Sequence, residues 1–179
     1  MKSLPVIFER KDEVDEIVRE CIETSKMDWD SFETSWDFKE HPFIVSAHMA
    51  SRNGEAVTIK QAFEDWKGVA DDRFRKLKDS ENKLNSLFID IYGLGEELTP
   101  EVEDKDVTVR KADLQREVRS FISYAVGCMF GRYSLDIPGL VYAGGTWDAS
   151  KYRHSSRTRT PSSLFVMMNI LRMISWVVL

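Results

Sequence analysis

The amino-acid sequence predicts a mainly α-helical chain, with long amphipathic helices, connecting loops and at most one or two short strands. Three observations lead to this class. Apolar residues recur at helical spacing over two long stretches, residues 58–92 and 113–133. Hydrophobic residues make up 42% and charged residues 31% of the 179 positions, a balance typical of a folded domain. The β-branched run at residues 107–109 is too short to build a sheet.

The first predicted element is a short amphipathic helix over residues 13–27. Its apolar residues follow a spacing of three and four, while the acidic residues fall on the other face. These apolar residues are Val14, Ile17, Val18, Cys21 and Ile22.

Residues 28–43 predict an ordered loop or short turns rather than a helix. Five aromatic residues crowd into this stretch beside Ser, Asp and Pro: Trp29, Phe32, Trp36, Phe38 and Phe43. Trp29 and Trp36 could stack on bases, but we favour anchoring in the core or in the loop. Asn53-Gly54 then marks a turn.

Residues 58–92 predict one long helix of about 35 residues, roughly 50 Å at 1.5 Å per residue. Thr58 and Gln61 fit a capping box at its start, and Gly93 fits its end. Apolar residues with a period of seven form a stripe along this helix, and such a stripe needs a packing partner. The stripe consists of Phe63, Ala70, Leu77, Leu84 and Ile91. Five residues widen the stripe: Ile59, Trp66, Phe74, Leu87 and Phe88. Three polar residues interrupt it: Arg73, Ser80 and Glu81.

The remaining elements are a connector, a strand, a helix and turns. Residues 96–106 are acidic and predict an exposed connector, and residues 107–109 predict one short strand. Asp113 is the expected N-cap of a helix that runs to about Tyr133. Ser123, Gly127 and Gly131 recur every four residues, a small-residue stripe that would let another helix approach closely. The apolar run of this predicted helix, residues 121–130, is too short to span a bilayer. Turns are expected at residues 138–139 and 144–145.

Charge and cysteine content restrict the function classes. The net charge of −5 argues against a chain that binds DNA through its overall charge. Cys21 and Cys128 are too few for a disulfide framework, so we expect reduced thiols and a cytoplasmic protein. Charged residues at positions 9–13 interrupt any apolar run of the kind found in signal peptides.

The charge pattern divides the chain at about residue 152. All 30 acidic residues lie within residues 1–150, whereas residues 151–179 hold five basic residues and no acidic one. Because Met and Trp each have one codon, back-translation fixes parts of the other reading frames, and one frame yields an acidic sequence like that of residues 1–150. We therefore expect a helical region over residues 1–152 and an out-of-frame, poorly ordered tail over residues 153–179. The alternative is a genuine basic and apolar tail that anchors the chain.

No residue can be assigned to catalysis, to cofactor binding or to a metal. Methylation of an amino group on a DNA base needs an Asn/Asp-Pro-Pro-aromatic tetrad and a glycine-rich turn after a strand. None of the five prolines adjoins another, and the three histidines lack zinc-ligand spacing. A basic cluster remains as a candidate for contacts with DNA phosphates: Arg110, Lys111, Arg116, Arg119 and Arg132. We favour the alternative that these residues pair with Asp113, Glu117 and Asp136.

Several sequence motifs resemble one family. They are DWDSFETSWDF and HPF at residues 28–38 and 41–43, LNSLFIDIYGLGEEL, and SYAVGCMFGRYSLD with YAGG after it. Together they resemble a region downstream of the catalytic domain in adenine-specific DNA methyltransferases of the PglX type, from bacteriophage-exclusion (BREX) systems. The resemblance covers roughly residues 3–152. It implies a parent enzyme that transfers a methyl group from S-adenosylmethionine to adenine N6 in a specific DNA site.

The expected function is therefore that of a non-catalytic fragment. In the parent it would scaffold the catalytic and target-recognition parts, with DNA as partner and other defence subunits as further partners, and without a membrane. The alternative is a stand-alone helical protein-interaction module of a defence complex. The acidic balance of residues 1–150 disfavours a third class, a DNA-binding module without catalysis.

Overall fold

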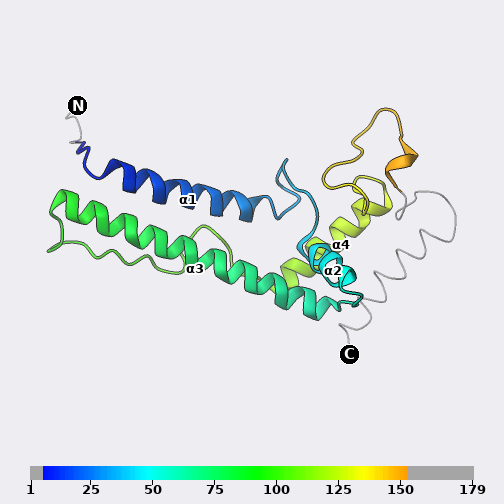
Figure 1. The fold of residues 1–179 in the computed structure, drawn as a ribbon, viewed down its shortest axis with the longest axis horizontal. Coiled ribbons are helices and arrows are strands. Elements are labelled where there is room, and N and C mark those ends of the chain that lie inside the picture. The colour runs from blue at the N-terminus through cyan, green and yellow to red at the C-terminus, as the bar shows by residue number, and fades with distance from the viewer. Residues whose placement is uncertain (1–5, 153–179) are drawn as a thin grey trace. The chain divides into compact units, whose positions relative to one another are not determined.

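The computed structural model describes residues 6–152, and this part of the chain is mainly helical, as predicted. Its elements are α1 (Lys11–Trp29), α2 (Pro42–Arg52), α3 (Ile59–Tyr92), α4 (Leu114–Met129) and the short 3-10 helix η1 (Ala149–Lys151) (Figure 1). Within the described residues no segment is a β strand. The expected out-of-frame tail, residues 153–179, lies outside the described residues.

The described residues form two compact units. The first unit holds residues 6–28 and Ala70–Lys111, and the second holds residues 29–69 and 112–152. Helix α3 contributes its first eleven residues to the second unit and the rest to the first.

In the first unit, α1 runs antiparallel to the second part of α3 (Figure 1). Ser80 of α3 donates to Glu20 of α1 over 3.5 Å, and Arg73 donates to the backbone oxygen of Met27 over 3.2 Å. The hydrophobic core of this unit includes Phe74, Leu77, Val107 and Val109, with Cys21 and Val102 packed against it. The predicted stripe of α3 therefore has its partner in α1 and the segment after the connector.

The ends of α3 follow the predicted pattern, whereas its buried face departs from it at Ser80, at Arg73 and at Phe88, which was expected to widen the stripe but is 44% exposed. Thr58 Oγ1 accepts from the Gln61 amide over 3.2 Å, and Gly93 ends the helix at a φ of 66°. Ala70 and Leu77 of the stripe are buried. Ser80 does not interrupt the buried face: it is only 3% exposed because its hydroxyl faces the Glu20 carboxylate. Arg73, also expected to interrupt, instead reaches the end of α1.

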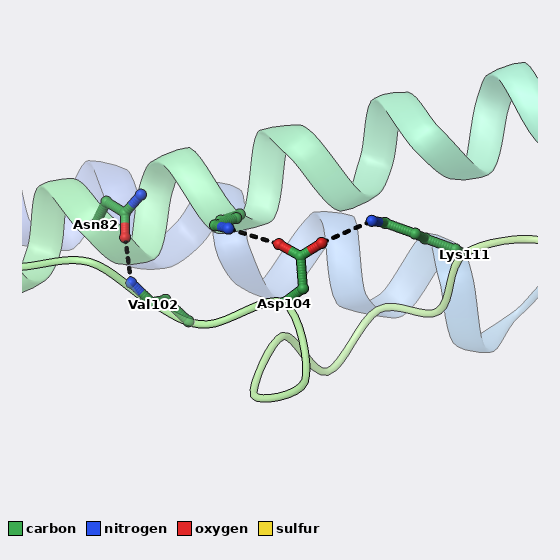
Figure 2. A network of polar contacts seen from close by, with 5 residues as sticks. Asn82, Val102, Asp104 and Lys111 are labelled. Carbon is green, nitrogen blue, oxygen red and sulfur yellow. Dashed lines mark hydrogen bonds and ion pairs between the residues drawn. The ribbon is translucent and has the colours of Figure 1, made fainter.

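The connector, residues 96–106, lies along α3 and is held by polar contacts (Figure 2). The side chain of Asn82 accepts from the Val102 amide over 2.7 Å, and Asn85 donates to the Pro100 carbonyl over 3.1 Å. The strand expected at residues 107–109 is wrong. Val107 and Val109 are buried with an exposed residue between them, which is the alternation expected of a strand. Both side chains pack against α3, and no neighbouring strand pairs with this segment in the described chain.

In the second unit, α2 is a helix that the sequence analysis did not predict. His41 caps its start, accepting from the Phe43 amide at Nδ1 over 3.2 Å, and Pro42 occupies its first turn. His41 is 1% exposed and lies against the rings of Phe43 and Phe121 at centroid distances of 4.8 and 5.3 Å. The histidine thus joins the start of α2 to the buried face of α4.

Aromatic residues fill the core of the second unit. Phe38 packs edge-on against Tyr124 and Tyr133, with ring centroids 5.8 and 5.5 Å apart. The two tyrosine rings stack on each other at 5.1 Å, and Cys128 completes the cluster. The loop before α2 is therefore pinned by Phe38, as its aromatic content suggested.

Helix α4 begins as predicted and ends earlier. Asp113 accepts from the Arg116 amide over 2.8 Å, which confirms the N-cap, but the helix ends at Met129 because Gly131 adopts a φ of 78°. The small-residue stripe is wrong as a helix-packing face. Ser123 is exposed, and the rings of Tyr133 and Trp147, rather than a second helix, lie against Gly127 and Gly131.

Candidate nucleic-acid interface

The five basic residues proposed from the sequence are divided between the two units. Arg110 and Lys111 end the first unit, whereas Arg116, Arg119 and Arg132 belong to the second. Arg110 is exposed.

Lys111 is engaged with two residues of its own unit. Its ammonium binds the Asp104 carboxylate over 2.8 Å and lies 4.3 Å from the centre of the Phe74 ring. Asp104 also pairs with Lys78 over 2.6 Å, so one carboxylate joins the connector to α3 and to the segment after it (Figure 2). Hydrogen bonds from Lys111 and then Lys78 lower the pKa of Asp104 to about 2. We infer that the main role of Lys111 is to stabilise the fold through these contacts.

Arg116 is bound to the neighbouring acid. Its Nη2 lies 2.6 Å from Oε1 of Glu117, and its Nε donates to the same oxygen over 3.0 Å. Glu117 is only 1% exposed, so the pair offsets the cost of burying a carboxylate. This pairing is one that we favoured over contact with DNA. Asp113, another expected partner, caps α4 instead.

Arg119 and Arg132 are both exposed but lie at different ends of α4. The last residue of α4, Met129, lies ten positions after Arg119, a rise of roughly 15 Å along the helix. Arg132 lies beyond that end, where its Nε donates to the Tyr133 hydroxyl over 3.2 Å. Arg116 and Arg119 are one helical turn apart, so they are the two members that the second unit brings together.

Two further titratable side chains of the second unit, His41 and Cys128, are buried. Burial lowers the pKa of His41 to about 3 and raises that of the Cys128 thiol to about 12, so the imidazole is neutral and the thiol protonated at pH 7. Between residues 6 and 152, no group of His, Cys, Asp and Glu side chains could hold a metal ion. None of the helices in that range is long and apolar enough to cross a membrane.

Comparison with known proteins gives the chain a family context. No protein-family model matches it. It is 50% identical over 151 residues, 84% of the chain, to the adenine-specific methyltransferase PglX of Lacticaseibacillus casei. This chain matches a PglX-type methyltransferase region. A second relative, the adenine-specific methyltransferase BrxX of Escherichia coli O9:H4, is 28% identical over 158 residues, 80% of the chain. The chain spans 12% of the length of each relative.

The chain also exposes aromatic side chains that we expected to be anchored. Trp36 is 97% exposed and Trp29 is 57% exposed, so the expectation of core or loop anchoring is wrong for Trp36. Phe32 and Phe38 provide the anchoring around it. No local signal distinguishes Trp36 from Phe38, which lies between the charged residues Asp37 and Lys39 and is nevertheless only 3% exposed.

Proposed function

We propose that this chain is a non-catalytic, helical scaffolding part of a site-specific adenine-N6 DNA methyltransferase in a phage-defence system. The observation that carries the proposal is the 50% identity to PglX over 151 residues. In this proposal the parent enzyme transfers the methyl group of S-adenosylmethionine to DNA in the cytoplasm. The region lies downstream of the catalytic domain and helps to position the catalytic and target-recognition parts.

The sequence supports the non-catalytic role. A flipped adenine is held by a polar side chain, a backbone carbonyl and a stacking aromatic ring, which the Asn/Asp-Pro-Pro-aromatic tetrad supplies. No two prolines of this chain are adjacent. We therefore assign the cofactor and the target base to other parts of the parent enzyme.

The geometry of α3 supports the scaffolding role. Its 34 residues rise about 51 Å. Both ends are capped, and in the first unit α1 and the connector hold it by contacts at Arg73, Lys78, Ser80 and Asn82. A helix supported on two sides keeps its shape, and catalytic groups must be held within about 0.5 Å of their productive positions.

DNA contact within the parent enzyme remains part of the proposal for the exposed basic residues only. Arg110, Arg119 and Arg132 are exposed, whereas Lys111 and Arg116 bind carboxylates of this chain. Phosphate contacts orient a protein on DNA without reading its sequence. Such contacts would suit a segment that positions other parts.

The test is a chimera of the L. casei enzyme in which the matched region is exchanged for residues 6–152 of this chain. We expect the chimera to transfer labelled methyl groups from S-adenosylmethionine to adenine in DNA. Leu77→Asp should abolish transfer, because Leu77 of α3 is 2% exposed in the core of the first unit. Leu98→Asp is the matched control, since Leu98 is 54% exposed and should tolerate the charge.

Two outcomes would overturn the scaffolding proposal. One is a Leu77→Asp chimera that methylates DNA at the unmodified rate, although circular dichroism shows that the helices are lost. The other is an L. casei enzyme that keeps full activity after deletion of the matched region. That second result would favour a stand-alone interaction module.

A further inference from the structure

The loop between α1 and α2 carries Trp36 at an exposed position between two anchored aromatic residues. Trp36 is 97% exposed. Four residues earlier, Phe32 packs edge-on against Trp66 with ring centroids 6.2 Å apart. Two residues later, Phe38 is 3% exposed and packs against Tyr133. The tryptophan is therefore presented by a segment fixed on both sides.

Hydrogen bonds fix the backbone of this loop. The Ser35 hydroxyl donates to Asp30 over 2.6 Å and accepts from the Asp37 amide over 3.0 Å. The Ser35 amide donates to the Phe32 carbonyl over 3.0 Å, and the Lys39 carbonyl accepts from the Gly139 amide over 2.6 Å. A loop that is already ordered loses little conformational entropy when its exposed side chain is bound.

The exposure of Trp36 is unusual for its residue type. Tryptophan is highly buried on average in folded proteins, and it is enriched among the residues that dominate protein–protein binding. Those residues occupy pockets from which water is excluded. A rigidly presented, exposed tryptophan thus fits an apolar pocket on another surface.

The charge around Trp36 selects the kind of surface. Residues 30–40 contain four acidic side chains, Asp30, Glu33, Asp37 and Glu40, and one basic side chain, Lys39. DNA phosphates would meet like charge here, which opposes stacking of Trp36 on a base. A protein pocket with a basic rim matches both the ring and its acidic surroundings.

We propose that the acidic Trp36 loop docks into an apolar pocket with a basic rim on the remainder of the methyltransferase polypeptide. The inference rests on the proposed function. The region spans 12% of the length of its relatives, so in such an enzyme the remaining polypeptide is by far the largest protein surface within reach of the loop. Trp36 provides the apolar contact, and the negative net charge of residues 30–40 orients the loop toward the basic rim.

The experiment measures the reactivity of Trp36 directly, by hydroxyl-radical footprinting with mass spectrometry. The free chain is compared with the chimera described above, in the absence of DNA. We expect oxidation of Trp36 to be at least about fivefold slower in the chimera, because a docked ring is shielded from solvent. Raising the salt concentration should restore part of the reactivity, since the rim contacts are electrostatic. Equal oxidation rates in the free chain and in the chimera would overturn docking.

Variants separate docking from a structural role. Trp36→Ala should leave the melting temperature of the free chain unchanged, because the side chain makes almost no contact there, and should lower that of the chimera. Met49→Ala is the control, since Met49 of α2 is 61% exposed and lies outside the loop. Equal effects of Trp36→Ala in the free chain and in the chimera would contradict the proposal.

Other occupants give different results. If short DNA protects Trp36 in the free chain as strongly as the chimera does, the ring stacks on bases and docking is refuted. Protection that grows with the concentration of the free chain would show self-association instead. A chimera that protects Trp36 but does not methylate DNA would refute the proposed function and leave the docking proposal intact. A chimera that methylates DNA while Trp36 stays reactive would refute only the docking proposal.

Discussion

Four glycine-to-alanine substitutions in the second unit separate two free-energy costs of adding a methyl group, which are left-handed backbone strain and overpacking. Gly131 has a φ of 78°, and a Cβ atom there would lie 2.5 Å from Cη2 of Trp147. At Gly127, inside α4, a Cβ atom would lie 2.6 Å from Cδ2 of Tyr133 without backbone strain. Gly54 has a φ of 74° with open space around it, and Gly68 lies in α3 with open space and no positive φ.

The geometry sets the expected free-energy changes. Gly68→Ala should stabilise the unit by up to about 1 kcal/mol, the difference in helix propensity. Gly54→Ala should cost about 1–2 kcal/mol from left-handed strain alone. Gly127→Ala adds an overpacking cost of about 1–3 kcal/mol, partly offset by the propensity gain. Gly131→Ala combines strain and overpacking, so it should cost about 2–5 kcal/mol.

The clash at Gly131 is expensive because the Trp147 ring has little freedom to move. It stacks on Tyr152 with centroids 4.2 Å apart, and the Tyr152 hydroxyl donates to the Gly131 carbonyl over 2.6 Å. Urea denaturation followed by circular dichroism measures the four changes, with a constant m-value as the check that each variant unfolds in the same way. A cost for Gly131→Ala no larger than that for Gly54→Ala would refute the reasoning, because it would mean that the ring gives way freely.

Three further predictions concern the core, the pH dependence and the chemistry. Leu77→Asp should lower the unfolding free energy of the chain by several kcal/mol in thermal or urea denaturation, because it places a charge among apolar side chains, whereas Leu98→Asp should change it little. Lowering the pH from 7 to 5 should cost about 2 kcal/mol through His41, since the unfolded chain binds a proton below a pKa of 6.5 while burial holds the native pKa at about 3. This stability is complete above pH 6.5 and lost as the pH falls toward 3; His41→Asn, which keeps the N-cap, should flatten the decline, and an unchanged slope would contradict it. The isolated chain should neither bind S-adenosylmethionine in calorimetry nor transfer labelled methyl groups to DNA, and transfer above background by protein from a host without methyltransferases would overturn this.

The long helices could be predicted from the sequence because their signals are local and repeated. The period-seven stripe of α3, its cap at Thr58 and its stop at Gly93 each point to the same element. Helix α2 was missed because eleven residues give few repeats, although His41-Pro42 at its start and Asn53-Gly54 at its end are ordinary helix signals.

The errors arise where tertiary contacts decide. Gly131 matched a spacing of four with Gly127, but its left-handed φ ends the helix. The pair at residues 107 and 109 alternates like a strand, yet it packs on α3 with no second strand in the described chain. Ser80 was predicted to interrupt the apolar stripe, but its buried hydroxyl donates to Glu20 of another helix. Contacts between residues distant in sequence, such as these, leave no local pattern.

The candidate DNA contacts were predictable only as residue types. Nothing local distinguishes Lys111, which shares Asp104 with Lys78, from Arg110, which is exposed. The partner of Lys78 lies 26 positions further along the chain, so its choice depends on the path of the connector.

The way in which α3 holds the connector predicts an unusual distribution of mutational tolerance. Asn82 binds the main-chain amide of Val102 (Figure 2). Asn85 binds the main-chain carbonyl of Pro100. Every residue offers a carbonyl, and all but proline offer an amide, so acidic positions such as Glu101 can be replaced without losing these bonds. The constraint falls on the recognising side chain instead. In a saturation mutagenesis library, Asn85, a surface residue, should resist replacement more strongly than the acidic residues of the segment that it holds.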